Sequence, residues 1–257
     1  MNTPFALLSS ALNVVVTGLF AAVVLRQYLK RHRSYQLYWA VGLLMAFVAT
    51  LAYVFMLQVQ PTSYNGIILF RTYYILGVLM PAWLGLGSIA LVSSPRVTTF
   101  CLTFLYLLSG LTTALILLAK IDLHKLSQIV GPGTGIIQPG PWLIAVIIAN
   151  TLGVVAVVGV AIYSGVKLYR RQQHIAGFRT SNILWANVLI LVGDLINAGA
   201  GAVARVLGIE SSFWVGMALG WIVFFAGVLL TSRRPKTVKA EPTKDFEDAE
   251  KRLASSN

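Results

Sequence analysis

The amino-acid sequence predicts an all-α membrane protein in which seven transmembrane helices form one bundle. Hydrophobic residues make up 57% of its 257 residues, and the mean hydropathy is +0.78. Only 11% are charged, whereas a soluble globular chain carries about 25%. The apolar residues also gather in segments of about 20 residues or more, the length that crosses a bilayer as a helix.

The apolar segments are separated by short polar connections. No charged region precedes the first segment and no small-residue cleavage pattern follows it, so we expect a retained helix rather than a signal peptide. Residues 1–232 are predicted to be a seven-helix transmembrane domain, and residues 233–257 a disordered polar tail in the cytoplasm. The expected spans are 5–27, 36–58, 65–93, 97–119, 142–168, 182–206 and 212–232.

Basic residues gather at alternate connections, which predicts the orientation of the bundle. One side is expected to hold Arg26, Lys30, Arg31, Arg33, Arg96, Lys167, Arg170, Arg171, Arg179, Arg233, Arg234 and Lys236. The other side is expected to hold only Arg71, Lys120, Lys125 and Arg205. Because cytoplasmic loops of membrane proteins carry the excess of Lys and Arg, the amino terminus is predicted outside and the carboxyl terminus in the cytoplasm. The expected location is the inner (plasma) membrane, as a multi-pass protein.

The net charge of +12 would indicate nucleic acid as a partner of a soluble protein. Here the basic residues flank apolar segments, so we expect membrane lipids, including anionic lipids at the cytoplasmic face, as partners and no nucleic acid.

The longest connection, 120–141, contains the glycine-rich run 131–135. No Gly-Lys-Ser/Thr follows the run and no strand precedes it, so a turn-rich connection is predicted rather than a phosphate-binding loop.

The two ends of the membrane domain are similar in sequence. Trp39 opens the second expected span as Trp185 opens the sixth, and Trp83 corresponds to Trp221 in the third and seventh. With the fourth span as linker, this pattern indicates a parallel 3+1+3 repeat, although chance similarity among apolar segments is an alternative. Asp194 aligns with Val48, so the acid breaks the symmetry.

Asp194 is the acidic residue deep in an apolar segment, 183–206. A charged carboxylate at the bilayer centre costs roughly 3 kcal/mol or more, so its side chain is expected to face the interior of the bundle. Asn197 follows at i+3 on the same face, and Gly193, Asn197 and Gly201 form a ridge that permits close helix contact. Two roles stay open, a structural hydrogen bond and a ligand, proton or ion site.

The 65–93 segment holds further candidates for a binding site. Arg71 either extends to the outer headgroups or pairs with Asp194, and Tyr73 and Tyr74 are polar groups that can face the interior. Pro81 is expected to kink the segment and to free a carbonyl near the middle of the membrane. Trp83 follows and either lines a pocket or packs.

Trp221 lies beside the Gly216 and Gly220 pair in the last segment. Such a pair is typical of close helix packing and by itself indicates little about function.

Catalytic and metal chemistry are not indicated. The single cysteine, Cys101, excludes an intrachain disulfide and a multi-cysteine metal site. The histidines, His32, His124 and His174, lie in expected loops, and the spans hold no paired acids and no Ser/His pair. We therefore expect no catalytic residues, no metal site and no cofactor.

The outside amino terminus, the 3+1+3 layout, and Arg71 followed by Pro81 resemble opsin-like and sugar-transporter-like seven-helix membrane proteins. The spans are also similar to the membrane sensor region of bacterial histidine kinases, without the kinase. The resemblance to microbial rhodopsins implies a retinal-bearing lysine in the last span, but residues 216–223 contain none, which excludes a covalent retinal Schiff base.

Two functions follow as hypotheses. The first is a receptor-like or sensor module that binds a small, largely apolar molecule among Asp194, Asn197, Arg71, Tyr73, Tyr74, Trp83 and Trp221, and signals to a protein partner. The alternative is a small-molecule transporter or channel, which suits a duplicated bundle.

Overall fold

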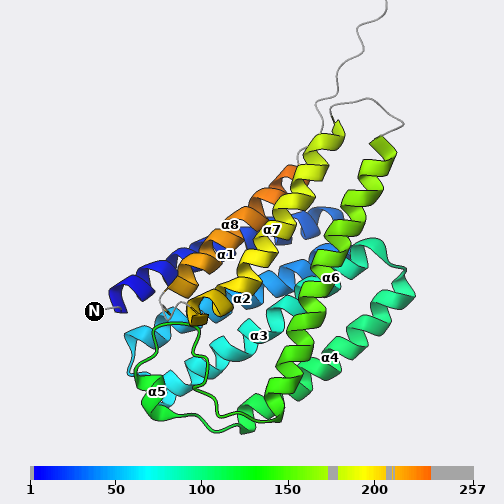
Figure 1. Ribbon diagram of the computed structural model, residues 1–257. Helices are drawn as coiled ribbons and strands as arrows, with labels where there is room; N and C mark the ends of the chain where they lie inside the picture. Colours follow the sequence, from blue (N-terminus) through cyan, green and yellow to red (C-terminus); the bar gives the residue numbers. More distant parts are fainter. Residues whose placement is uncertain (1–2, 173–178, 207–209, 211, 233–257) are drawn as a thin grey trace, which may run out of the picture.

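The computed structural model describes residues 3–172, 179–206, 210 and 212–232. The predicted tail, 233–257, lies outside the described residues. Every expected apolar segment falls on one of seven long helices, and a short helix, α5, lies in the longest connection (Figure 1). The helices are α1 (Thr3–Arg31), α2 (Ser34–Gln58), α3 (Tyr64–Val92), α4 (Pro95–Leu118), α5 (Leu123–Ser127), α6 (Pro141–Gln172), α7 (Arg179–Val206) and α8 (Ser212–Ser232).

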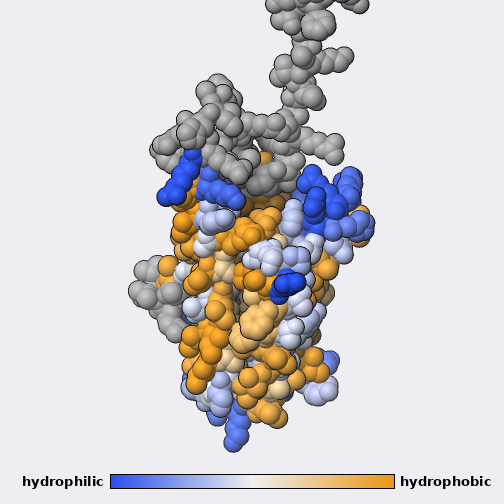
Figure 2. Space-filling view, turned by 90° about the vertical axis from the view of Figure 1, so that its right-hand side faces the viewer, coloured by the Kyte–Doolittle hydropathy of each residue, from blue (hydrophilic) through white to orange (hydrophobic). Residues whose placement is uncertain are grey.

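Six of the described helices, α1, α2, α3, α4, α6 and α8, are long and apolar enough to cross a membrane. In α7 the apolar stretch within the fully described residues is Trp185–Gly201. Large hydrophobic side chains are widely exposed on the outside of the bundle, for example Leu118 at 83% and Phe100 at 75%. Figure 2 shows hydrophobic residues over the middle of the visible face, with hydrophilic ones toward its upper and lower ends. The chain is an integral, multi-pass membrane protein, because a surface of this kind is stable only against lipid.

Six helices form a closed ring. Neighbouring helices in the ring contact one another in the order α1, α2, α3, α6, α7, α8, and α8 contacts α1 again. The helix α4 lies outside the ring against α3 and α6 (Figure 1). If α1, α2 and α3 are exchanged with α6, α7 and α8, the order of contacts around the ring stays the same.

Successive helices alternate in direction, so the connections lie at two ends of the bundle (Figure 1). We call one end the loop end; it holds the start of α1, the connection 59–63 and the connection 119–140. We call the other the basic end; it holds the connections 32–33 and 93–94 and the exposed side chains of Arg26, Arg31, Arg96 and Lys167.

The two halves of the ring meet at two places. Between α3 and α6 they meet along glycines, which we call the glycine seam. A Cβ added to Gly85 of α3 would lie 2.8 Å from the Cα of Gly153 in α6, and a Cβ added to Gly153 would collide with the backbone carbonyl of Pro81. The absence of side chains here lets the helix backbones touch.

Between α8 and α1 the halves meet through aromatic rings, which we call the aromatic seam. The ring of Phe20 in α1 lies 4.8 Å from that of Phe225, 5.5 Å from that of Phe224 and 6.3 Å from that of Trp221, all in α8. Nearer the loop end, Asn13 Nδ2 donates a hydrogen bond of 2.6 Å to a backbone carbonyl of α8.

The 119–140 connection folds over the loop end of the ring. The Asp122 carboxylate accepts a hydrogen bond from the backbone N–H of Lys125 and caps α5. The predicted turns are present, because Gly133 and Gly135 have positive φ angles of 70° and 83°. The segment is held against the bundle by the buried side chains of Leu126, Ile129, Ile136 and Ile137.

Candidate functional site

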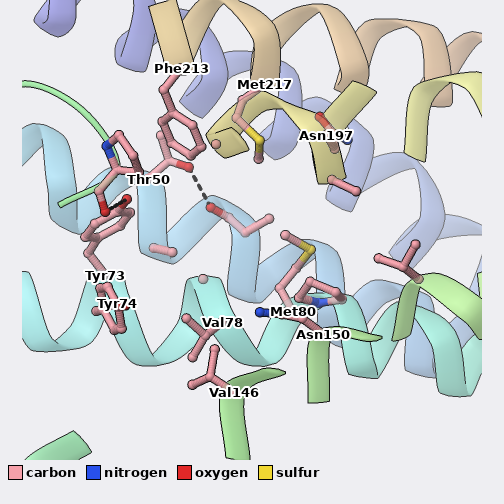
Figure 3. A pocket seen from close by; sticks show the side chains of 18 of the residues that line it. Thr50, Tyr73, Tyr74, Val78, Met80, Val146, Asn150, Asn197, Phe213 and Met217 are labelled. Carbon is pink, nitrogen blue, oxygen red and sulfur yellow. Dashed lines mark hydrogen bonds between the residues drawn. The ribbon is translucent and has the colours of Figure 1, made fainter. Parts of the chain in front are cut away.

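A cavity of about 560 Å³ lies inside the ring, toward the loop end (Figure 3). Its walls come from α2, α3, α6, α7 and α8, with the 119–140 connection as a roof. Most of the lining is apolar, and none of the described lining residues is Lys, Arg, His, Asp or Glu. Its polar side chains are those of Thr50, Tyr73, Tyr74, Thr134, Asn150, Thr151, Asn197, Trp214 and Trp221.

The roof of the cavity is joined to α3 by Tyr73. The Tyr73 hydroxyl donates a hydrogen bond of 3.0 Å to the backbone carbonyl of Pro132, and both residues line the cavity (Figure 3). The Tyr73 ring also lies against Tyr53 and Trp214, at centroid distances of 5.1 and 5.9 Å. This aromatic contact fixes the position of the roof over the apolar space below.

The α3 wall contains a backbone acceptor as well as apolar surface. The helix continues through Pro81, which has no N–H to donate to the carbonyl of Gly77 one turn earlier. Both residues line the cavity, and a Cβ added to Gly77 would meet no atom within 4 Å. Gly77 therefore leaves open volume beside a carbonyl that lacks its usual helical partner.

Two asparagines bring amide groups to the α6 and α7 walls. The Oδ1 atoms of Asn150 and Asn197 are buried and have no hydrogen-bond partner among the described residues. The Asn197 amide fits against Gly220 of α8, where a Cβ would collide with its oxygen. The amide nitrogen and oxygen can exchange places by a flip of the side chain, so either group can face the cavity.

Asp194 lies one helical turn beyond the cavity, toward the basic end. It shares a face of α7 with Ala198 and Gly201, which line the cavity, but it is not itself part of the lining. The residue is 9% exposed, and its Oδ2 atom has no hydrogen-bond partner among the described residues. The side chain is therefore buried, as expected. No ion pair joins it to Arg71 among the described residues, and a bond to a tyrosine or to a buried water stays a prediction.

Arg71 forms no ion pair with Asp194 among the described residues, and its extension to the outer headgroups stays a prediction. Its Nη2 donates a hydrogen bond of 3.3 Å to the backbone carbonyl of Ala119, at the end of α4. The Nε atom is buried without a partner in the described part of the chain. Arg71 thus holds α3 to the start of the roof connection and lies outside the cavity lining.

Trp83 lies on the side of α3 that faces α4. It is 6% exposed and packs with α4 and α6, with its ring 5.4 Å from that of Tyr106. Trp221, its counterpart in α8, lines the cavity. The structure therefore brings Tyr73, Tyr74, Asn197 and Trp221 together around the cavity and places Asp194, Arg71 and Trp83 elsewhere.

Sequence reasoning missed several residues of the interior. Thr50, Gly77, Trp214 and Met217 line the cavity, yet an apolar, small or single polar residue in an apolar span carries no distinguishing signal. The sequence did contain a signal for a buried polar stripe on α1, because the polar residues of the stripe recur at i, i+4 and i+8. That stripe consists of Ser9, Asn13 and Thr17.

No three His, Cys, Asp or Glu side chains among the described residues gather closely enough to hold a metal ion. Comparisons of the chain with protein families, with curated proteins and with solved structures found no match. Function is therefore argued from the cavity itself.

Proposed function

We propose that this protein binds a small, largely apolar molecule in the cavity and acts as a receptor-like or sensor module that signals to a protein partner. The observation that carries the proposal is the cavity of about 560 Å³ with an apolar, uncharged lining. Ligand pockets commonly measure about 300–1,000 Å³ and combine apolar walls with a few placed polar groups.

The filling of the ring toward the basic end supports binding rather than conduction. Beyond Trp221 the interior is packed with apolar side chains, including Phe20, Leu84, Val157 and Phe224. The cavity lining reaches Trp221 and the Pro81 level and does not include this layer. A bound molecule would rest on the layer and change its packing, which gives a route from the cavity to the basic end.

A transporter or channel is the second candidate, and the ring supports it. The order of helix contacts repeats between α1–α3 and α6–α8, with α4 outside, as a parallel 3+1+3 repeat requires. Osmotic swelling of proteoliposomes with glycerol and glucose tests this candidate. Swelling faster than that of protein-free vesicles would favour transport, and equal swelling would favour sensing.

The same helix order supports seven spans with the amino terminus outside. If α7 is counted as a span, the excess of basic residues places the basic end in the cytoplasm, because Arg26, Arg31, Arg96 and Lys167 lie there. These side chains would also attract anionic lipid. A cysteine introduced by Ser256→Cys should resist impermeant thiol reagents in intact cells. Its modification there would reverse the orientation.

The binding proposal is tested by filling the cavity through Gly77→Leu. A leucine at this position extends into open volume, so it should displace a ligand and leave the helices in place. The probe is a long-chain alcohol with a diazirine in its chain, photolabelled in vesicles and mapped by mass spectrometry. We expect labelling of cavity peptides from α3 and α8 to fall by roughly tenfold, the loss that about 1.4 kcal/mol of binding energy produces.

The matched control is Gly110→Leu in α4. A Cβ at Gly110 also meets no atom within 4 Å, but the residue is exposed on the outside of the bundle. Labelling of the cavity should be unchanged in this variant. Equal labelling of Gly77→Leu and the wild type, with both proteins folded, would contradict the proposal.

A further inference from the structure

The walls of the cavity differ in their exposure to the outside of the bundle. On the α2 wall the lining residues are buried, such as Ala49 at 3%, and on the α8 wall none is exposed, with Trp221 at 2%. On the α6 wall, Val155 is 61% exposed although it also lines the cavity, and Thr151 is exposed as well. On the facing α7 wall, Ala198 is exposed. The cavity thus reaches the outer surface between α6 and α7.

The α7 side of this opening is formed by small residues. A Cβ added to Gly199 would meet no atom within 4 Å, and one added to Gly201 would approach only a ring carbon of Phe213, at 3.9 Å. Neither position is crowded by a side chain of the described residues. The small residues therefore leave room on the α7 side of the opening.

The surroundings of the opening are apolar. The exposed stripe on α6 that leads to Thr151 and Val155 consists of large aliphatic residues, Ile147, Ile148 and Leu152, which are 56%, 43% and 50% exposed. Such a stripe lies against hydrocarbon in a membrane protein. A molecule that uses this opening would come from the bilayer rather than from water.

The polar groups near the opening suit an uncharged partner. Asn150 and Asn197 line the cavity, and their buried Oδ1 atoms have no hydrogen-bond partner among the described residues. The Asn197 oxygen lies against Gly220 of α8. The Gly77 carbonyl, which Pro81 cannot bond, is a further acceptor on the opposite wall. A charged headgroup would find no counter-charge in the lining, and burying it would cost several kcal/mol.

We propose that the cavity binds a neutral, lipid-dissolved amphiphile, a long alkyl or isoprenoid chain ending in a hydroxyl or similar neutral group, which enters from the bilayer between α6 and α7. The neutral head bonds the amides of Asn150 and Asn197, and the chain lies along the apolar walls of α3 and α8. This inference rests on the proposed binding function and names its class of ligand and its route of entry.

The first experiment compares headgroups. Wild-type protein in phosphatidylcholine vesicles is photolabelled with probes that share one diazirine-bearing alkyl chain and end in a hydroxyl, an ammonium or a carboxylate. We expect the alcohol to label the cavity at least roughly tenfold more efficiently than either ion, because of the cost of burying an unpaired charge. Preference for the ammonium would overturn the neutral-head assignment and point to Asp194 as a counter-ion. Preference for the carboxylate would overturn it as well.

The second experiment narrows the opening with Ala198→Leu or Val155→Trp and follows labelling after rapid addition of the alcohol in donor vesicles. A narrowed entrance should slow loading and release by a factor of roughly five or more. The control is Ala114→Leu, a substitution of an exposed alanine on α4, which should leave both rates unchanged.

The outcomes separate this inference from the binding proposal. Unchanged loading in both narrowed variants, with wild-type folding verified by thermal unfolding, would overturn entry between α6 and α7. Loss of labelling in Gly77→Leu alongside that result would still support binding in the cavity. Absence of cavity labelling in the wild type with all three probes would instead contradict the proposed function.

Discussion

The two halves of the ring have the same order of contacts but are filled differently. Half of the most apolar stretch of α2 and of α3 is buried, against 28% of that of α6. In the first half, the α2 and α3 side chains interdigitate, with Leu84 against Gly42 and Trp39 against Gly87. In the second half, α6 and α7 leave an opening beside Val155 and Ala198. The α7 and α8 side chains interdigitate as well, with Phe224 against Gly193, so the difference between the halves is confined to the contact of α6 with α7.

Buried polar side chains differ by chemical type rather than by half of the ring. Hydroxyl groups of the first half bond to carbonyls of their own helix, as Thr17, Thr50 and Ser88 do at 2.6, 2.8 and 3.2 Å. In the second half, Asp194 and Asn197 carry buried oxygens without partners among the described residues. Hydroxyls are satisfied locally, whereas carboxyl and amide groups need a partner from elsewhere. Amide groups of the first half lack partners as well, since Asn13 Oδ1 and Gln36 Oε1 are buried without one among the described residues.

Positions that align in sequence do not share an environment. Val48 is 40% exposed, whereas Asp194, which aligns with it, is 9% exposed. Trp39 donates from Nε1 to the Ser88 hydroxyl at 3.4 Å, whereas Trp185 is 60% exposed. The order of helices fits a repeat, but the residue-by-residue alignment stays a prediction.

The largest change in the free energy of unfolding is expected at the glycine seam between the halves. Gly153→Leu places a side chain into the Pro81 backbone and should lower the free energy of unfolding by about 3 kcal/mol or more. Gly159→Leu, in the same helix but with no atom within 4 Å of its Cβ, should change it by less than about 0.5 kcal/mol. Reversible unfolding in mixed micelles measures both. Equal effects would show that the glycine seam does not limit the packing of the halves.

An intermediate effect, of opposite sign, is expected at Asp194. Because its Oδ2 has no partner, Asp194→Leu should raise the free energy of unfolding by about 1–3 kcal/mol, which is the order of the cost of a carboxyl group in a membrane. Thr50→Val, a loss of one bond to the same helix, should change it by less than about 1 kcal/mol. A marked loss of stability in Asp194→Leu would mean that the carboxyl pins α7 structurally.

The smallest changes in the free energy of unfolding are expected at the two aligned tryptophans, Trp39 and Trp185. Trp39→Phe removes a hydrogen bond and packing against Gly87, and should cost about 1 kcal/mol. Trp185→Phe changes an exposed residue and should stay within about 0.5 kcal/mol. The same unfolding measurement applies. Similar losses at both positions would indicate equivalent environments and strengthen the residue-level repeat.

Hydropathy predicted where the long helices lie, because burial in lipid requires about 20 apolar residues irrespective of neighbours. It predicted part of the cavity, since Tyr73, Tyr74, Asn197 and Trp221 combine polar or aromatic groups with apolar spans. The direction of Trp83 was not predictable, because α3 is apolar all round and only its contact with α4 decides which side is occupied.

Two other features depend on neighbours that the sequence does not identify. Gly77 creates open volume only because nothing from α6 or α8 fills the space beside it. The position of α4 outside the ring depends on the order of the helices, and short connections are compatible with more than one order. Arg71 bonds Ala119 rather than Asp194 for the same reason, since the end of α4 lies within its reach.

The two seams give the bundle joints of different mechanical character. At the glycine seam, Gly85 and Gly153 bring backbone against backbone, so no side chain of these two residues opposes a small slide of α6 along α3. At the aromatic seam, Phe20 is interlocked with Phe224 and Phe225, and sliding there would require the rings to leave their packing sites. We therefore expect the halves to turn about the aromatic seam and to shear at the glycine seam. Such a movement would change the spacing between Pro81 and α6, and with it the width of the space that a guest molecule occupies.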